Sequence, residues 1–151
     1  WLIGGPDLAN PNSVTPQEVA AWQSEGAVEC LGHCPDVPSL YSHAHIVTLP
    51  SYYGEGLPKS LIEAAACGRA VVTTNLPGCR DAIEPDISGF LVPARDEVAL
   101  ADALEILIRD ATLRQTMGKA GRALAEREFG IEKVVAAHLQ IYCELLESCA
   151  S

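Results

Sequence analysis

The chain has 151 residues, a length that suits one domain. Apolar residues make up 48% and charged residues 20%, which is ordinary for a globular protein without a membrane-spanning helix. The formal net charge of −10 argues against nucleic-acid binding and against docking on anionic lipid through this domain, because both need a basic face. The six cysteines lack a small-scaffold disulfide pattern, and reduced, buried thiols of a cytoplasmic protein are the plain interpretation.

Strand and helix patterns alternate along the first third of the chain. Residues 1–3 form an apolar run that predicts a strand and precedes a Gly-Gly-Pro turn. Thr15 and Glu18 have the spacing of a capping box, so a helix is expected from Pro16 to about Gly26. The expected elements that follow are a strand at 27–31, a short helix at 37–44 and a strand at 45–49.

The same alternation continues to the end of the chain. A helix is expected at 58–67 with Gly68 as its stop, followed by strands at 70–74 and 89–92. Asp96 is expected to cap the first of three further helices. This order predicts a doubly wound, mostly parallel α/β sheet of the Rossmann-like type, truncated at its N-terminal strand. Ligands of such sheets bind at the carboxyl ends of the strands.

The stretch 49–68, LPSYYGEGLPKSLIEAAACG, connects an expected strand to an expected helix. The first N–H groups of a helix have no intrahelical partner, and such a terminus binds anions and hydroxyl-rich ligands. Two carboxylates, Glu55 and Glu63, frame the turn, and helix geometry lets Glu63 lean back toward the same ligand. Each carboxylate can accept two hydrogen bonds from a vicinal diol. Gly54 and Gly56 are interpreted as glycines that the turn requires.

The pair Glu55 and Glu63, with seven residues between, resembles the E-x7-E signature of retaining glycosyltransferases of the family-4 type (group 1), which have two Rossmann-like domains in the B-type fold. The flanking motifs occur in the same order as in that family. They are Leu49-Pro50-Ser51, Glu63-Ala64, Cys67-Gly68, Val71-Val72-Thr73-Thr74, Pro77-Gly78-Cys79-Arg80-Asp81 and Ser88-Gly89-Phe90-Leu91-Val92-Pro93. The resemblance covers about residues 1–146 and implies the C-terminal, nucleotide-sugar donor-binding domain of such an enzyme.

The resemblance also implies roles for individual residues. Glu55, the catalytic candidate, would contact donor-sugar hydroxyls near the reacting carbon, and Glu63 would bind the ribose. The main-chain N–H groups that would contact the sugar and the diphosphate belong to Gly56, Leu57, Lys59 and Ser60. The base would lie near Gly32 and His33, with Leu40 at its edge. The donor would be a nucleoside diphosphate sugar, for which UDP is expected, and no metal would be required.

By the same resemblance, residues 1–130 form the nucleotide-sugar-binding domain and residues 131–151 its crossover helix and tail. The family's basic Arg and Lys pair and its acceptor-binding domain are not in this chain, so we expect the chain to be inactive alone. The last helix would expose an apolar stripe that the acceptor domain covers. The whole enzyme would be cytoplasmic, meeting the membrane only through its full-length form, and the motif variant Gly-Leu-Pro is typical of members that build bacterial surface polysaccharides or lipid-linked oligosaccharides.

Three alternatives remain open at this stage. The chain would belong to a sugar-nucleotide epimerase of related architecture, or to a non-catalytic nucleotide-sugar sensor. The third alternative is a zinc site, because Cys30 and Cys34 have the spacing of structural zinc ligands and histidines lie nearby. We favour a strand end over a zinc site, since alternation along the strand places Cys30 and Leu31 on opposite faces.

Overall fold

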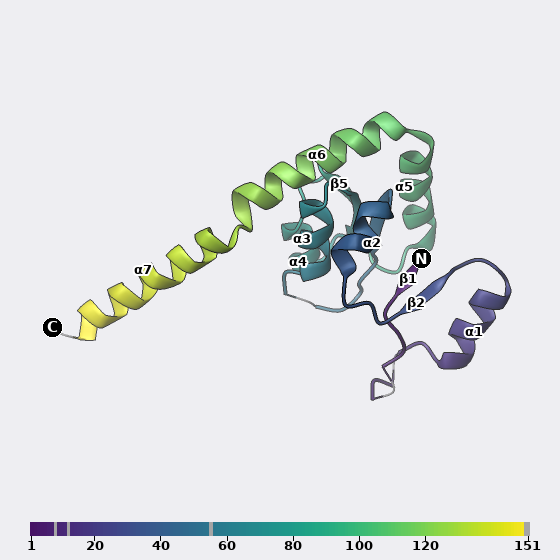
Figure 1. Ribbon diagram of the computed structural model, residues 1–151, viewed down its shortest axis with the longest axis horizontal. Coiled ribbons are helices and arrows are strands. Elements are labelled where there is room, and N and C mark those ends of the chain that lie inside the picture. The colour runs from purple at the N-terminus through teal and green to yellow at the C-terminus, as the bar shows by residue number, and fades with distance from the viewer. Residues whose placement is uncertain (8, 12, 55, 150–151) are drawn as a thin grey trace. The chain divides into compact units, whose positions relative to one another are not determined.

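The computed structural model describes residues 1–7, 9–11, 13–54 and 56–149. The described chain divides into two compact units, Trp1–Val37 and Pro38–Ser151. In chain order the elements of Figure 1 are β1 (Leu2–Ile3), α1 (Pro16–Ser24), β2 (Cys30–Gly32), α2 (Val37–His43), β3 (Ile46–Leu49), α3 (Lys59–Ala66), β4 (Ala70–Thr74), α4 (Pro77–Asp81), β5 (Gly89–Val92), α5 (Glu97–Arg109), α6 (Ala111–Glu128) and α7 (Ile131–Cys149).

The first unit holds a two-stranded parallel sheet and one capped helix. β1 pairs with β2 in parallel, and the Leu2 N–H donates to the Glu29 carbonyl at 2.9 Å. The predicted capping box of α1 is confirmed, since the Glu18 N–H donates to Thr15 Oγ1 at 3.2 Å and the Thr15 N–H donates to Glu18 Oε2 at 2.8 Å. The strand expected at 27–31 is displaced to Cys30–Gly32. Because β1 has only two residues, it can form strand hydrogen bonds with only a short part of the segment around residues 27–32.

The second unit is built on a three-stranded parallel sheet in the order β3-β4-β5. Val72 of β4 is in register with Thr48 of β3 and Phe90 of β5. All five residues of the central strand β4 are buried, as expected of a β-branched strand covered on both faces. The predicted α/β class with parallel strands is therefore confirmed, and the strands fall into two sheets.

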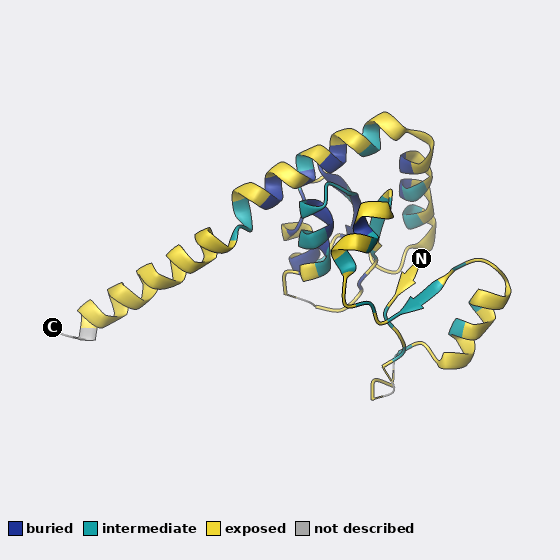
Figure 2. Cartoon of the chain, in the orientation of Figure 1, coloured by how far each residue is buried: buried dark blue, intermediate teal, exposed yellow. Residues whose placement is uncertain are grey.

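The core of the second unit lies between the sheet and helices α5 and α6, where the dark blue residues of Figure 2 gather. Its fully or nearly buried members are Ala70, Val72, Val92, Ala103, Leu107 and Met117. The caps that begin the two helices are aspartates: Asp96 Oδ1 accepts from the Ala99 N–H at 2.9 Å, as expected, and Asp110 Oδ1 accepts from the Leu113 N–H at 2.8 Å. The buried side of α3 consists of Leu61, Ala64 and Ala65.

Helix α6 also packs closely on α3 and on the turn that follows it. Gly68 ends the helical segment with a φ of +68°, in the left-handed region that favours glycine, as the sequence predicted. The space beside Gly118 is so narrow that an added Cβ would lie 2.2 Å from the Gly68 carbonyl oxygen. One turn later, a Cβ added at Gly121 would lie 3.6 Å from Ala65, which is an ordinary contact distance.

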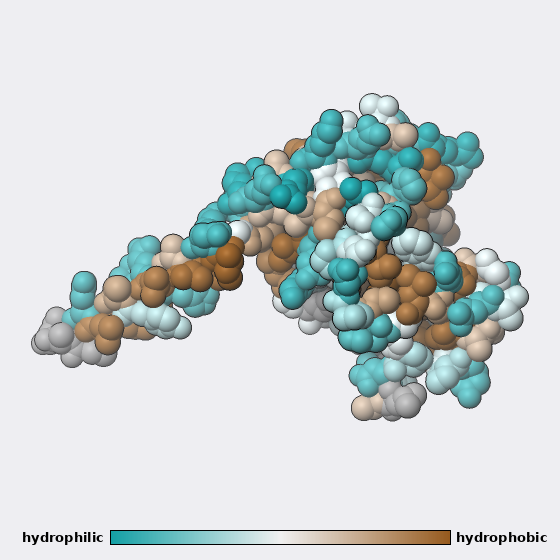
Figure 3. Space-filling model, viewed as in Figure 1, coloured by the Kyte–Doolittle hydropathy of each residue, from teal (hydrophilic) through white to brown (hydrophobic). Residues whose placement is uncertain are grey.

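Residues 131–148, which make up almost all of α7, are exposed (Figure 2). The exposed apolar stripe expected there is confirmed and is visible as a brown band along α7 in Figure 3. It includes Val134, Val135, Leu139, Tyr142 and Leu145, which are 41–58% exposed. Among the described residues, no helix is both long and apolar enough to cross a membrane.

Candidate functional site

The predicted site segment, residues 49–68, begins at the carboxyl end of β3 and continues into helix α3. Pro58 is buried and is the N-cap residue of α3, one position before the helical place expected for it, and no side chain caps the helix start. The first hydrogen bond of the helix is donated by the Leu61 N–H to the Pro58 carbonyl at 3.1 Å. The N–H groups of Lys59 and Ser60 precede that bond, so the helix presents the uncapped N-terminus that anions favour.

Two buried threonines of β4 hold the start of this stretch in place. Thr73 Oγ1 donates to the Leu49 carbonyl at 2.8 Å, and Thr74 Oγ1 donates to the Ser51 carbonyl at 2.6 Å. Both threonine side chains are almost completely buried, where a hydrogen bond replaces the water that the hydroxyl has lost. The chain that leaves β3 is therefore anchored to the neighbouring strand before it turns toward α3.

Glu63 and Lys59, two predicted site residues, lie together one turn apart on α3. Their side chains form an ion pair of 3.4 Å, in which Glu63 is 32% exposed and Lys59 is 88% exposed. An exposed pair at this spacing contributes only about 0.3–0.5 kcal/mol, so a ligand phosphate can draw the lysine away at little cost. The predicted catalytic residue Glu55 lies outside the described residues.

A buried tyrosine of α2, Tyr41, is hydrogen-bonded to the first turn of α3. Its hydroxyl donates to the Ser60 carbonyl at 3.1 Å, and the residue is only 5% exposed. Burial raises the pKa of Tyr41, and the nearby Glu63 carboxylate raises it further, so the hydroxyl keeps its proton and remains a donor. Tyr41 is not among the site residues predicted from the sequence. The available signal was a tyrosine in a short, otherwise apolar helix.

The two glycines before α3, Gly54 and Gly56, have open space where a side chain would be. Neither Gly54 nor Gly56 has the positive φ that favours glycine, and an added Cβ would meet nothing within 4 Å at either position. The described residues therefore give no steric support to the interpretation that the turn requires these glycines, and it stays a prediction because residue 55 between them lies outside the described residues. The main chain at Gly56 and at the exposed residue Leu57 is accessible to a ligand from solvent.

A second feature at the carboxyl edge of the sheet is a hollow of about 180 Å³ beside Tyr52. Its lining includes Pro50, Thr74 and Val92, which stand at or just after the ends of three neighbouring strands. The Arg95 guanidinium lies 4.6 Å from the centre of the Tyr52 ring. Tyr52 lines the hollow, and the ring of Tyr53 packs on the ring of Tyr52. The two tyrosine hydroxyls share a hydrogen bond of 3.1 Å.

The residues expected around the base lie in different parts of the chain. Gly32 ends β2 with a φ of +65°, and His33 next to it is exposed, both in the first unit. Leu40 is half-buried in α2, in the second unit. The base subsite therefore stays a prediction. Arg80 folds back onto Asn75, to which its Nε donates at 2.7 Å.

Metal-ligating side chains do not gather in the described part of the chain, which holds no group of three or more His, Cys, Asp or Glu residues placed to bind a metal ion. Cys30 and Cys34 are both half-buried free thiols, and Cys34 Sγ contacts the Leu31 carbonyl at 3.6 Å. The expectation of buried cysteines is wrong for Cys143, which is exposed on α7.

A parallel α/β unit with an uncapped helix terminus at the carboxyl edge defines a class of domains that bind phosphate-bearing ligands. Comparison with known proteins narrows the class. Residues 1–110 match the family model described as glycosyl transferases group 1. This match covers more than half of the 151 residues of the chain, so the chain belongs to the group 1 glycosyltransferase family.

Individual relatives agree with this assignment. The chain is 29% identical over 147 residues to the N,N'-diacetylbacillosaminyl-diphospho-undecaprenol alpha-1,3-N-acetylgalactosaminyltransferase of Campylobacter jejuni, covering 97% of this chain and 37% of that protein. It is 32% identical over 147 residues to a D-inositol 3-phosphate glycosyltransferase of Xylanimonas cellulosilytica, covering 95% of this chain and 34% of the relative. The chain thus spans about a third of the length of these curated relatives.

A solved structure of the B-type glycosyltransferase fold gives the same architecture. The structure of HepE from Anabaena, solved in complex with UDP, superposes with a TM-score of 0.81 at 27% identity. The match covers 97% of this chain and 40% of HepE. The fold and family inferred from the motifs around Glu63 are therefore confirmed.

Proposed function

We propose that this chain is the donor-binding half of a retaining glycosyltransferase that moves a sugar from a UDP-sugar to a glycan or lipid-linked acceptor. The observation that carries the proposal is the uncapped N-terminus of α3 at the carboxyl end of β3, with the Glu63 carboxylate on the same helix. Positive helix ends bind phosphates, and a half-exposed carboxylate accepts hydrogen bonds from ribose hydroxyls. HepE, which shares the fold, has been solved with UDP.

In the proposed complex the main-chain N–H groups of Gly56, Leu57, Lys59 and Ser60 bind the sugar and the diphosphate. Lys59 leaves Glu63 and turns to a phosphate oxygen, and Glu63 takes the ribose. Glu55 holds the sugar hydroxyls near the anomeric carbon. The bond between that carbon and the diphosphate oxygen breaks, the acceptor oxygen bonds to the same face, and the acceptor proton passes to the departing diphosphate. These residues need no metal for this arrangement.

The remaining parts of the proposal concern the rest of the protein. The exposed apolar stripe of α7 packs against the acceptor-binding domain of the whole enzyme. Exposed apolar surface of this extent marks an interaction site. The chain by itself binds UDP weakly and transfers no sugar, because transfer needs an acceptor site in addition to the donor site at α3. The whole enzyme works in the cytoplasm on surface polysaccharide or a lipid-linked precursor.

The first test is a titration of the 151-residue chain with UDP, followed by amide NMR and calorimetry. Shifts are expected at Gly56, Lys59, Ser60 and Glu63. Glu63→Gln is expected to weaken UDP binding by about tenfold or more, because a hydrogen bond to a charged acceptor contributes roughly 1.5–3 kcal/mol. Unchanged amides in this segment at millimolar UDP contradict the proposal.

The matched control is Glu105→Gln on α5, which removes a carboxylate that also pairs with a cation four residues away. This variant is expected to bind UDP like the parent. A second arm replaces UDP with 2'-deoxy-UDP, which lacks one ribose hydroxyl. If Glu63 holds the ribose, the deoxy ligand loses affinity for the parent but not for Glu63→Gln. Equal losses in both proteins would remove Glu63 from the ribose site.

A further inference from the structure

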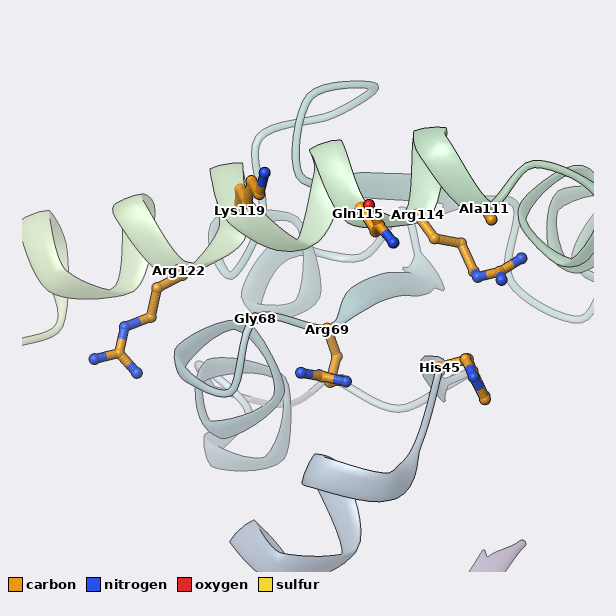
Figure 4. A pocket seen from close by; sticks show the side chains of 8 residues that line it. All are labelled: His45, Gly68, Arg69, Ala111, Arg114, Gln115, Lys119 and Arg122. Carbon is orange, nitrogen blue, oxygen red and sulfur yellow. The ribbon is translucent and has the colours of Figure 1, made fainter.

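The amino edge of the three-stranded sheet, opposite the proposed donor site, carries a hollow of about 560 Å³ (Figure 4). His45 and Arg69 directly precede β3 and β4, and four polar residues of α6 line the hollow. These four are Arg114, Gln115, Lys119 and Arg122. Parallel strands all begin at one edge of a sheet and all end at the opposite edge, so this hollow is separate from the segment 50–58. Its size is that of an ordinary small-molecule site.

The charge of this hollow is opposite to that of the chain. Four of the ten Lys and Arg residues line it, and none of the described residues in its lining is acidic, although the chain has a net charge of −10. Of these four, Arg122 pairs with Glu126 at 2.6 Å, whereas no described carboxylate forms an ion pair with Arg69, Arg114 or Lys119. A concave cluster of one sign focuses its field locally, which lets it attract an anion that the rest of the surface repels.

Hydrogen bonds to the main chain hold two of the arginines in position. Arg69 Nε donates to the Cys67 carbonyl at 2.8 Å, and its Nη1 donates to the Ala44 carbonyl at 3.0 Å. Arg114 Nη1 donates to the carbonyls at the end of α5, at 2.8 Å for Ile108. These bonds stabilise helix ends, and they also fix the guanidinium groups while leaving other N–H donors of each fork unused. Preorganised guanidinium groups are suited to bind phosphate oxygens.

Lys119 distinguishes a ligand-binding role of the hollow from a purely structural role of its cationic side chains. It lies on α6 one position after Gly118, whose close contact with Gly68 fixes this part of the helix. Its ammonium group is exposed and makes no hydrogen bond or ion pair with any described residue, so it stabilises no helix end. We propose that the hollow binds a phosphate-bearing ligand with two or more negative charges, and that Lys119 contacts this ligand directly.

The test is an amide NMR titration of the 151-residue chain with inorganic pyrophosphate, at constant ionic strength maintained with sodium chloride. Saturable shifts are expected at Arg69, Gln115 and Lys119. Lys119→Gln is expected to weaken the affinity about fivefold to tenfold, as for the loss of one charged hydrogen bond. Since Lys119 is exposed, this change leaves the core intact. Lys133→Gln, which removes an exposed lysine at the start of α7, is the control and is expected to bind pyrophosphate normally.

Two further arms decide the source of the phosphate. Vesicles that contain cardiolipin, whose headgroup carries two phosphates, and vesicles of phosphatidylcholine alone are sedimented with the parent and with Lys119→Gln. Binding to the cardiolipin vesicles alone, weakened by the substitution, assigns a lipid headgroup. Pyrophosphate binding without vesicle binding assigns a free phosphate compound. The proposal is overturned if neither ligand binds, if the shifts are confined to residues 56–60, if chloride alone reproduces them, or if Lys119→Gln leaves binding unchanged. Because the readout is local to each edge of the sheet, this result is independent of UDP binding.

Discussion

Two glycines on one face of α6 should respond in opposite ways to the same substitution. In Gly118→Ala the new Cβ would lie 2.2 Å from the Gly68 carbonyl oxygen and 2.9 Å from its carbonyl carbon. Contact between carbon atoms is favourable only at about 3.5–4.0 Å, so the helix and the turn after α3 must separate by roughly 1 Å. In Gly121→Ala the nearest atoms, the Cα and Cβ of Ala65, are 3.6 Å away, an ordinary contact.

The magnitudes decide the sign of each change. Replacing glycine by alanine inside a helix stabilises it by about 1 kcal/mol. Overpacking costs roughly 1–3 kcal/mol, and the upper part of this range applies to Gly118 because the opposing atoms are main chain and cannot rotate away. We therefore expect Gly118→Ala to lose about 2 kcal/mol of unfolding free energy, while Gly121→Ala gains up to about 1 kcal/mol.

Thermal unfolding followed by circular dichroism, with urea unfolding at 25 °C, measures both variants against the parent. For a chain of this size, Gly118→Ala should lower the Tm by roughly 4–8 °C and Gly121→Ala should raise it by roughly 2–4 °C. The reasoning is wrong if Gly118→Ala is as stable as Gly121→Ala, because the close approach of α6 to the turn at Gly68 would then not affect the free energy of unfolding.

Two further predictions concern the anchored segment and the first helix. Thr74→Val removes the buried hydroxyl that donates to the Ser51 carbonyl, and it should lower the free energy of unfolding in urea by about 1–3 kcal/mol. The control is Thr48→Val, which changes an exposed threonine of β3 and should stay within about 0.5 kcal/mol of the parent. Equal stabilities of the two variants would mean that the Thr74 hydroxyl does not hold the segment. Hydrogen bonds from the Thr15 main chain and side chain lower the pKa of Glu18, so the capping box is complete above the pKa of an unfolded glutamate and is lost as the pH falls through the lower folded pKa. The Thr15 amide signal should follow this acid transition in the parent and be insensitive to it in Glu18→Ala, and a transition that persists in the variant would assign it to another group.

Much of this protein follows from local pattern. The β-branched run at 70–74 predicts its central strand because such side chains fill a surface buried on both faces. Thr15 with Glu18, and Asp96 three residues before Ala99, predict helix starts because a cap needs only its own neighbours in the chain. Gly68 predicts a helix end for the same reason. The spacing of Glu55 and Glu63, with the motifs around them, was sufficient to indicate the family.

Contacts between distant segments were decided only by the tertiary structure. The bond from Tyr41 to the Ser60 carbonyl and that from Thr74 to the Ser51 carbonyl join residues 19 and 23 positions apart, and no local rule specifies such partners. The basic hollow at the amino edge likewise assembles Arg69 with residues of α6 that lie 42 to 53 positions further along the chain. Sequence period determines which face of an element is apolar, whereas side-chain partners depend on how the elements stack, because packing is set by the whole fold.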